Sequence, residues 1–389
     1  MGKKILIISP TPSHPQNAGN RVRINNLITS LKNLGYDIYF LYINQEDGDV
    51  ELMQDCWGEK FYLLTYQAPI IKPSISWRLV TKIKSIFGRE HIYIYSIDDW
   101  YDKSVDSFIQ ELQRKEKFDM VIVEYVFLSK ALENFDHSVL KIIDTHDVFT
   151  NRHNLYLKKC QSPEWYFTNN REEAKGLNRA DVIIAIQLKE ANFFRKISIK
   201  PVIQIGHLLS LCKPITKKRA DPKLLFIASS NTINVHGLDY FLEKIFPLVR
   251  SHYPSVELLI AGGICQIIGN YPGCIKLGFM EDVGEAYQMS DIVINPILFG
   301  TGLKIKSIEA LGYSKALVTT SAGAMGLEAG KNTAFLVADE ASAFAKQILL
   351  ILNNPKFFQE LTENAYKYAE QYNQNNLRVL QDVLNKRLS

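Results

Sequence analysis

Two lysines and a glutamate follow a glycine turn in the second half of the chain, and these residue types suit an anionic ligand that also carries hydroxyl groups. The segment Asn295–Gly323 reads NPILFGTGLKIKSIEALGYSKALVTTSAG. An apolar strand over 291–295 precedes the loop Gly300-Thr301-Gly302, and we expect a helix from about Leu303. The start of such a helix offers free backbone N–H groups and a positive dipole end, which together bind phosphate.

Lys304 and Lys306 add positive charge at this helix start. Residues two apart on a helix point about 200° apart, so we expect at most one lysine to face the phosphates. Glu309 lies one turn beyond Lys306 on the same face, where its carboxylate can accept hydrogen bonds from a ribose. A glycine turn alone is often only a tight turn. With these charges beside it, the pattern favours a nucleotide diphosphate.

A second group of candidate residues lies in the sequence DTHD at 144–147, with His153 nearby. Asp144 and His146 leave the end of an expected strand on the same side. A metal site needs a third ligand, and the sequence fixes none. The pattern therefore favours a histidine lining a cleft, and we expect no metal ion.

Alternating strands and helices surround these candidates. In the first half we expect strands at 4–9, 37–43, 120–124, 140–144, 182–185 and 202–205, and a helix at about 21–34. In the second half we expect strands at 224–228, 256–261, 275–278, 292–295, 316–319 and 333–337, and a helix at about 238–252. This order predicts an α/β fold with a parallel sheet in each half.

Open α/β sheets bind ligands at the carboxyl ends of their strands, so we predict two Rossmann-like domains facing a central cleft. Three prolines and a basic run between Lys200 and Lys223 indicate the hinge. We expect an N-terminal domain over residues 1–212 and a C-terminal domain over 213–370. Residues 371–389 are expected to form a helix, apolar on one stripe from 375 to 388, that packs back towards the N-terminal domain.

The composition excludes several other classes of protein. The 389 residues are enough for two domains, and 45 basic against 41 acidic residues give no basic excess that nucleic-acid binding would need. Five cysteines without a CxxC pair indicate reduced thiols. The longest uncharged run, 258–275, contains glycines and a proline, which does not suit a spanning helix. We therefore expect a soluble, cytoplasmic protein.

One segment suggests contact with a membrane. Residues 72–89, KPSISWRLVTKIKSIFGR, carry five basic side chains and no acidic one, with apolar residues gathered on one helical face. Packing of that face on a domain is the more common outcome. The alternative is peripheral binding at the inner face of the membrane, to anionic lipid or to a lipid-linked acceptor.

Several segments along the chain resemble the GT-B glycosyltransferases, in particular the family 4-like (group 1) enzymes of bacterial surface-polysaccharide assembly. The segments that carry the resemblance are 277–328, 231–263, 179–195, 144–149 and 8–23. The resemblance implies a hexosyltransferase-like enzyme that moves a sugar from a nucleotide-diphosphate sugar to an acceptor hydroxyl. It further implies that residues 1–212 form the acceptor-side domain and residues 213–370 the domain that binds the nucleotide-sugar donor. Retention of anomeric configuration and the absence of a cofactor are also implied.

The resemblance also implies roles for individual residues. His146, Lys304 and Glu309 would be catalytic, and Asp147 would lie on the side of the saccharide or lipid-linked acceptor. The remaining expected site residues would bind the donor: Gly19, Arg21, Ser229, Ser230, Phe279, Met280, Thr301, Gly302, Leu303 and Lys306.

The chain departs from the family pattern at two places. Thr301 stands where many members have a glutamate, and the loop at 229–237 lacks the arginine and lysine that neutralise the leaving diphosphate. Either Lys304, Lys306 or Arg21 supplies that charge, or catalysis is weak. Two alternatives therefore stay open, a nucleotide-sugar epimerase of the same fold and a nucleotide-sugar binding protein. No GxGxxG motif supports a dinucleotide-dependent oxidoreductase.

Overall fold

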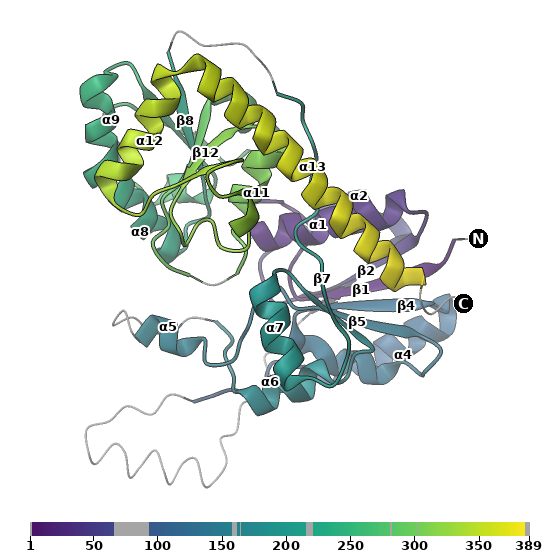
Figure 1. The fold of residues 1–389 in the computed structure, drawn as a ribbon. Coiled ribbons are helices and arrows are strands. Elements are labelled where there is room, and N and C mark those ends of the chain that lie inside the picture. Colours follow the sequence, from purple (N-terminus) through teal and green to yellow (C-terminus); the bar gives the residue numbers. More distant parts are fainter. Residues whose placement is uncertain are drawn as a thin grey trace, which may run out of the picture.

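The computed structural model describes residues 2–65, 93–157, 162–163, 165–214, 221–280, 282–300 and 302–385. These residues form two separate parallel sheets with helices packed around each (Figure 1). The predicted fold class, two Rossmann-like halves, is confirmed. The basic segment 72–89 and Thr301 lie outside the described residues.

The first sheet has seven strands in the order β3-β2-β1-β4-β5-β6-β7, and every neighbouring pair is parallel. Its strands are β1 (Lys4–Ser9), β2 (Asp37–Asn44), β3 (Phe61–Thr65), β4 (Met120–Glu124), β5 (Leu140–Asp144), β6 (Val182–Ala185) and β7 (Val202–Gln204). The helices that accompany it are α1 (Gly19–Asn33), α2 (Val50–Trp57), α4 (Val105–Glu116), α5 (His153–Leu157), α6 (Asn170–Leu177) and α7 (Leu188–Ile197).

Strand β1 shows why this sheet is buried on both faces. Ile5 and Ile7 pack into one apolar cluster with residues of α1, while Leu6 and Ile8 pack into another with residues of α4 and α7. Successive side chains of a strand point to opposite faces, so a strand covered on both sides needs an unbroken apolar run. The sequence KILIIS supplies that run.

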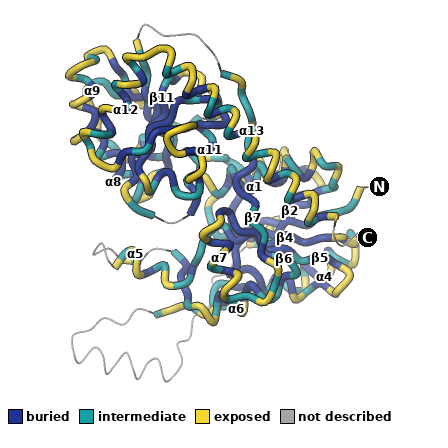
Figure 2. The backbone as a smooth tube through the Cα atoms, viewed as in Figure 1, coloured by how far each residue is buried: buried dark blue, intermediate teal, exposed yellow. Residues whose placement is uncertain are grey.

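The second sheet repeats the same strand order with six strands, β10-β9-β8-β11-β12-β13. Its strands are β8 (Lys223–Ile227), β9 (Glu257–Ala261), β10 (Cys274–Gly278), β11 (Ile292–Asn295), β12 (Ala316–Thr319) and β13 (Leu336–Val337). Its helices are α8 (Thr232–Tyr240), α9 (Phe246–His252), α10 (Val283–Met289), α11 (Ile305–Gly312) and α12 (Ala341–Asn353). Most of its strands are buried, as the dark segments inside the upper half of Figure 2 show.

Helix α8 begins six residues before the start expected from the sequence. The side chain of Asn231 accepts a hydrogen bond from the backbone N–H of Asn234 at 2.9 Å and caps the helix, which therefore starts at Thr232. The helix start expected at about 238 therefore lies inside α8. A π-turn at Phe241–Ile245 then joins α8 to α9.

The last helix, α13 (Pro355–Asn385), is 31 residues long and starts well before the expected 371. Leu361 and Ala365 pack into the cores around the second sheet, whereas Leu380 and Leu384 pack into a core of the first. Figure 1 shows this helix running from the second sheet to the first. One continuous helix is therefore built into both halves.

Candidate active site

A cleft of about 700 Å3 opens at the carboxyl ends of the strands and is lined by residues of both halves. The two sheets have the same strand order. In each sheet the direction of that order reverses between two neighbouring strands, β1 and β4 in the first sheet and β8 and β11 in the second. Such sheets bind ligands at this point of reversal. Eleven of the fourteen predicted site residues line this cleft: Gly19, His146, Asp147, Ser229, Phe279, Met280, Gly302, Leu303, Lys304, Lys306 and Glu309.

Three predicted residues are not among those that line it. Thr301 lies outside the described residues, and Ser230 is exposed beside the cleft. Arg21 turns away, because its guanidinium donates to the carbonyls of Asp47 (2.7 Å) and Pro15 (3.3 Å). It also lies 3.6 Å from the Glu46 carboxylate. Arg21 therefore fixes the loop after β2, and the donor-binding role predicted for it has no geometric basis.

Three helices begin at the cleft. The first residues of α1, α8 and α11 all contribute to its lining. A side chain at Gly19 would meet the side chain of Ile305 at 3.4 Å, so the starts of α1 and α11 face each other across the gap between the halves. Helix starts carry partial positive charge and unpaired N–H groups, so this part of the cleft attracts anions.

Lys306 connects two of these helix starts. Its Nζ donates to Oδ1 of Asn234 on α8 at 2.8 Å and lies 4.5 Å from the centre of the Phe226 ring. Loss of hydration in this wall, together with the nearby Lys304, lowers the pKa of Lys306 to about 7. An anion bound here would restore the charge of the ammonium.

Lys304 is the extended N-cap residue of α11, not part of the helix, and its side chain points the other way. Its Nζ donates to the carbonyl of Gly302 at 3.3 Å. Burial lowers the pKa of Lys304, and Asp147 and Glu190 of the first half oppose that shift. Lys304 therefore faces the carboxylates across the gap.

Gly302 has φ of 75°, a conformation that L-residues with side chains rarely adopt. A Cβ at this position would lie 3.9 Å from the carbonyl oxygen of His146 and 3.9 Å from a carboxyl oxygen of Glu190. The glycine therefore lets the second half approach the first closely. Glu190 accepts a hydrogen bond from Gln187 at 2.8 Å, and burial raises the pKa of Glu190 to about 8.

Glu309 lies further along α11, with 14% of its side chain exposed to the cleft. One carboxyl oxygen is 3.6 Å from Nε2 of His207, a fully buried residue that follows β7. Burial, followed by the Glu309 charge, raises the pKa of Tyr287 well above its ordinary value. The carboxylate is thus fixed at the junction of the halves, with its exposed part free to accept bonds from a diol.

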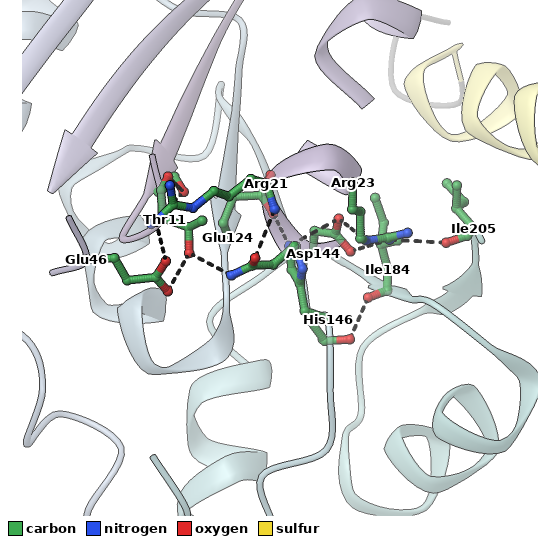
Figure 3. Close-up of polar contacts among 12 residues, drawn as sticks. Thr11, Arg21, Arg23, Glu46, Glu124, Asp144, His146, Ile184 and Ile205 are labelled. Carbon is green, nitrogen blue, oxygen red and sulfur yellow. Dashed lines mark hydrogen bonds and ion pairs between the residues drawn. The ribbon is translucent and has the colours of Figure 1, made fainter. Parts of the chain in front are cut away.

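Below the first half's side of the cleft lies a buried cluster of charged groups. Arg23 forms a bidentate pair with Asp144 (Nη2–Oδ1 2.7 Å, Nε–Oδ2 3.0 Å), as Figure 3 shows. Nε2 of His146 is 2.6 Å from Oε2 of Glu124 and 3.8 Å from Asp144. His146 itself has φ of 57°, which turns its ring onto Tyr125 (centroids 4.3 Å apart).

Glu124, Asp144 and His146 place three potential ligand atoms within 4.8 Å of one another. Arg23, however, occupies both oxygens of Asp144 and brings a full positive charge to the same spot. A cation would have to displace that guanidinium. The cluster is therefore an ion-pair network.

Aromatic side chains form the outer wall of the cleft on the first half. Tyr125 lies between His146 and Trp165, with the Trp165 ring centroid 5.2 Å away. Phe127 continues the wall to Trp100 at 5.6 Å. Gln45, Glu46 and Arg152 add polar groups to the lining. A wall of this composition suits a pyranose ring, which has apolar C–H faces and polar edges.

Sequence reasoning missed Arg23, Glu124 and Glu190 as members of this region. A signal existed for one of them, because Glu124 is the last residue of β4 and pairs in register with Asp144, the last residue of β5. Two acidic residues that end neighbouring parallel strands must lie side by side. Arg23 and Glu190 come from helices whose orientation no local pattern specifies.

Residues 221–354 match the family model described as Glycosyl transferases group 1. The group 1 glycosyltransferase match thus lies within the second half of the chain. The whole GT-B chain is also 23% identical over 397 residues to an uncharacterized 44.6 kDa protein in the cps region of Klebsiella pneumoniae, covering 95% of this chain and 96% of that protein.

Solved glycosyltransferases share the GT-B fold of the whole chain. Sucrose-phosphate synthase from Thermosynechococcus elongatus matches with TM-score 0.68 at 14% identity, covering 99% of both chains. The pneumococcal O-GlcNAc transferase GtfA, in complex with UDP and GlcNAc, matches with TM-score 0.69 at 10% identity, covering 100% of this chain and 99% of the other. Anabaena HepE, in complex with UDP and glucose, matches with TM-score 0.64 at 13% identity, covering 99% and 100%.

The fold implied by the resemblance is thereby confirmed for the whole chain, and the family match is confirmed over residues 221–354. In the part of the GT-B chain that the structure describes, no helix combines the length and apolar character that crossing a bilayer requires.

Proposed function

We propose that this chain transfers a sugar from a nucleotide-diphosphate sugar to an acceptor hydroxyl, in the assembly of a polysaccharide or glycoconjugate. The observation that carries the proposal is the position of Lys306. Its ammonium is bonded to Asn234 at 2.8 Å, between the starts of α8 and α11. A cation between two helix starts at the edge of a sheet is an arrangement that binds a diphosphate.

The position of Lys306 also supports an explanation of how the leaving diphosphate is neutralised without the arginine and lysine that are missing from 229–237. Asn234 belongs to α8, which that loop opens, so Lys306 reaches from α11 to the place where the missing charge would act. We assign the neutralising role to Lys306. Lys304, held towards Gly302 and the first half, would instead lie nearer the sugar.

The proposed mechanism depends on where charge develops. As the sugar leaves, negative charge grows on the diphosphate and positive charge grows at the anomeric carbon. Backbone N–H groups at the start of α11 and the Lys306 ammonium would stabilise the diphosphate without a metal ion or a cofactor. Loss of one such preorganised donor typically reduces turnover by about a hundredfold to a thousandfold.

The acceptor would enter along the aromatic wall of the first half. Trp165 and Trp100 would contact the apolar face of an acceptor sugar, and Glu46 would accept bonds from its hydroxyls. A saccharide fits this wall, whether free or attached to a lipid. Asp147, predicted on the acceptor side, is held by Arg152 at 2.6 Å and would act through that pair. Peripheral contact with a membrane through 72–89 stays a prediction.

Names of similar proteins narrow the choice of substrates to test. HepE and GtfA hold UDP in their solved complexes, so UDP is the first nucleotide to try. The relative from a cps region supports a role in surface polysaccharide. The family resemblance is the only support for retention of anomeric configuration and for transfer of a hexose.

A thermal-shift screen against UDP, GDP, ADP, CMP and dTDP tests the proposal. One nucleotide at 100 times its Kd should stabilise the protein by about 2.7 kcal/mol. Lys306→Met should remove most of that shift. Lys346→Met, on an exposed site of α12, is the matched control and should retain it.

Incubation with the corresponding nucleotide sugar then separates the possible activities. Slow hydrolysis, or transfer to an added acceptor, supports a transferase. An epimerised sugar formed from the donor alone, without an acceptor, would identify the protein as an epimerase and not a transferase. Nucleotide binding without any turnover would indicate a binding protein.

A further inference from the structure

The pair Glu124–His146 carries information about protonation that the family assignment does not contain. Glu124 is fully buried, and its second carboxyl oxygen, Oε1, has no hydrogen-bond partner among the described residues. Its first, Oε2, is 2.6 Å from Nε2 of His146. A contact of that length between a carboxyl group and an imidazole requires a hydrogen between them.

The charge of the cluster decides how many protons it holds. Arg23 and Asp144 contribute one positive and one negative charge and sum to zero. An ionised Glu124 beside a neutral His146 would leave the cluster with one uncompensated negative charge in a buried site, which is strongly unfavourable. One additional proton on the Glu124–His146 pair makes the whole cluster neutral.

Other titratable groups nearby do not change this sum. Tyr125, against which the His146 ring stacks, is uncharged below its raised pKa. Two surrounding ion pairs are Glu46 with Arg21 (3.6 Å) and Asp147 with Arg152 (2.6 Å), and each sums to zero. Burial favours the uncharged form of both Glu190 and Lys304, because it raises the pKa of Glu190 to about 8 and lowers the pKa of Lys304.

We propose that Glu124 and His146 share one extra proton, and that Nδ1 of His146 therefore carries a hydrogen and serves as a donor to the sugar bound in the cleft. The conclusion holds wherever the shared proton lies. On Nε2, it makes an imidazolium whose two nitrogens both carry hydrogen. On Oε2, it makes a carboxylic acid that donates to Nε2, and the neutral ring then carries its hydrogen on Nδ1.

This assignment makes Glu124 a positioning residue that acts through His146. His146 lines the cleft, and Nδ1 is the ring nitrogen that Glu124 leaves available. Stacking on Tyr125 fixes the plane of the ring. The class of ligand follows from the donor: an oxygen lone pair, such as a sugar hydroxyl offers. The role of Nδ1 as a donor to the sugar rests on the proposed transferase activity, whereas the shared proton does not.

Nuclear magnetic resonance of protein labelled with 15N-histidine tests the protonation directly. The chain has eight histidines, and the His146 ring signals can be assigned by their loss in His146→Asn. We expect Nδ1 of His146 to carry hydrogen throughout pH 6–8. An unprotonated Nδ1 at neutral pH would overturn the inference, whatever the protein's activity proves to be.

Donor hydrolysis by Glu124→Leu tests the positioning role. The substitution removes both carboxyl oxygens, whereas a glutamine amide could still donate to Nε2 of His146 and keep the hydrogen on Nδ1. An unchanged UDP thermal shift would show that the fold and the nucleotide site are intact. We then expect turnover to fall by about tenfold to a hundredfold, the loss usual when the partner of a functional histidine is removed. Glu111→Leu, exposed on α4, is the control. Equal turnover in the two variants would contradict the positioning role, and an inactive wild-type protein would instead contradict the proposed function.

Discussion

Arg23 and Asp144 are 121 residues apart in the sequence, yet their side chains form a buried bidentate ion pair. Arg23 also donates to the carbonyls of Ile205 and Gly206, so one guanidinium joins α1, the end of β5 and the segment after β7 (Figure 3). The pair fixes the strand end from which His146 follows. The geometry of the cleft therefore depends on the charge of Asp144, although Asp144 is not among the residues that line the cleft.

Arg23→Met should destabilise the protein by about 3–5 kcal/mol, because the Asp144 carboxylate would stay buried without a partner. Urea unfolding followed by circular dichroism measures the loss. Lys4→Met breaks the partly exposed pair with Glu116 and is the control, with an expected cost below about 1 kcal/mol. Similar losses of unfolding free energy in both variants would show that burial of the Arg23–Asp144 pair does not increase the cost of breaking it.

Nucleotide affinity should depend on pH through Lys306. With its pKa lowered to about 7, free Lys306 is protonated below that pH and increasingly neutral above it. A bound diphosphate favours the ammonium, so binding above pH 7 takes up a proton and affinity falls as the pH rises. The fall can reach about tenfold per pH unit until the raised pKa of the complex is passed.

Calorimetric titration with UDP from pH 7.5 to 8.5 measures this slope, because a terminal phosphate with a second pKa of about 6 is almost fully ionised there. Lys306→Met should bind weakly at every pH and show no slope. A slope that survives in Lys306→Met would assign the proton to a different group.

Glu309→Ala should weaken nucleotide binding through the ribose. Wild-type protein is expected to prefer UDP over 2′,3′-dideoxy-UDP by about 1.5–3 kcal/mol, as for hydrogen bonds to a charged group. The variant should lose that preference and most of the thermal shift. Glu285→Ala, exposed on α10, should behave as the wild type. A preference retained by Glu309→Ala would place the ribose elsewhere.

Gly206 is a tight point between the halves. A Cβ there would overlap the hydroxyl of Tyr372 on α13, and the Gly206 N–H already donates to Oδ1 of Asn376 at 2.7 Å. Gly206→Ala should cost about 1–3 kcal/mol by overpacking, measured by thermal unfolding. Gly269→Ala has room for the methyl group and should change stability little. Equal melting temperatures for the two variants would mean that Tyr372 on α13 moves to make room for the methyl group.

Strand positions were predictable because parallel strands buried on both faces need apolar runs of a characteristic length. Strands β1, β4, β5, β6, β11 and β12 have the expected bounds. Strand β3, with the mixed sequence FYLLT, was not predicted; its burial alternates, which is typical of a sheet edge. Helix α13 was expected to start sixteen residues later, since only its end shows a clear apolar stripe.

The site was predictable where one short segment supplies it. Gly302, Lys306 and Glu309 are neighbours on one turn and the helix after it, so spacing alone brought them together. Arg21 and Arg23 show the limit of such reasoning. Two positions apart on α1, they point in different directions, and the one chosen from the sequence holds a loop while the other joins the buried cluster.

Helix α13 has a consequence for dividing the chain. Its first part belongs to the core of the second half and its last part to the core of the first, so a single cut in the connection between the sheets would leave the two pieces attached. Residues 1–212 and 213–389, produced as separate polypeptides, should therefore reassemble through the final helix. The chain thus offers a natural split site for complementation experiments.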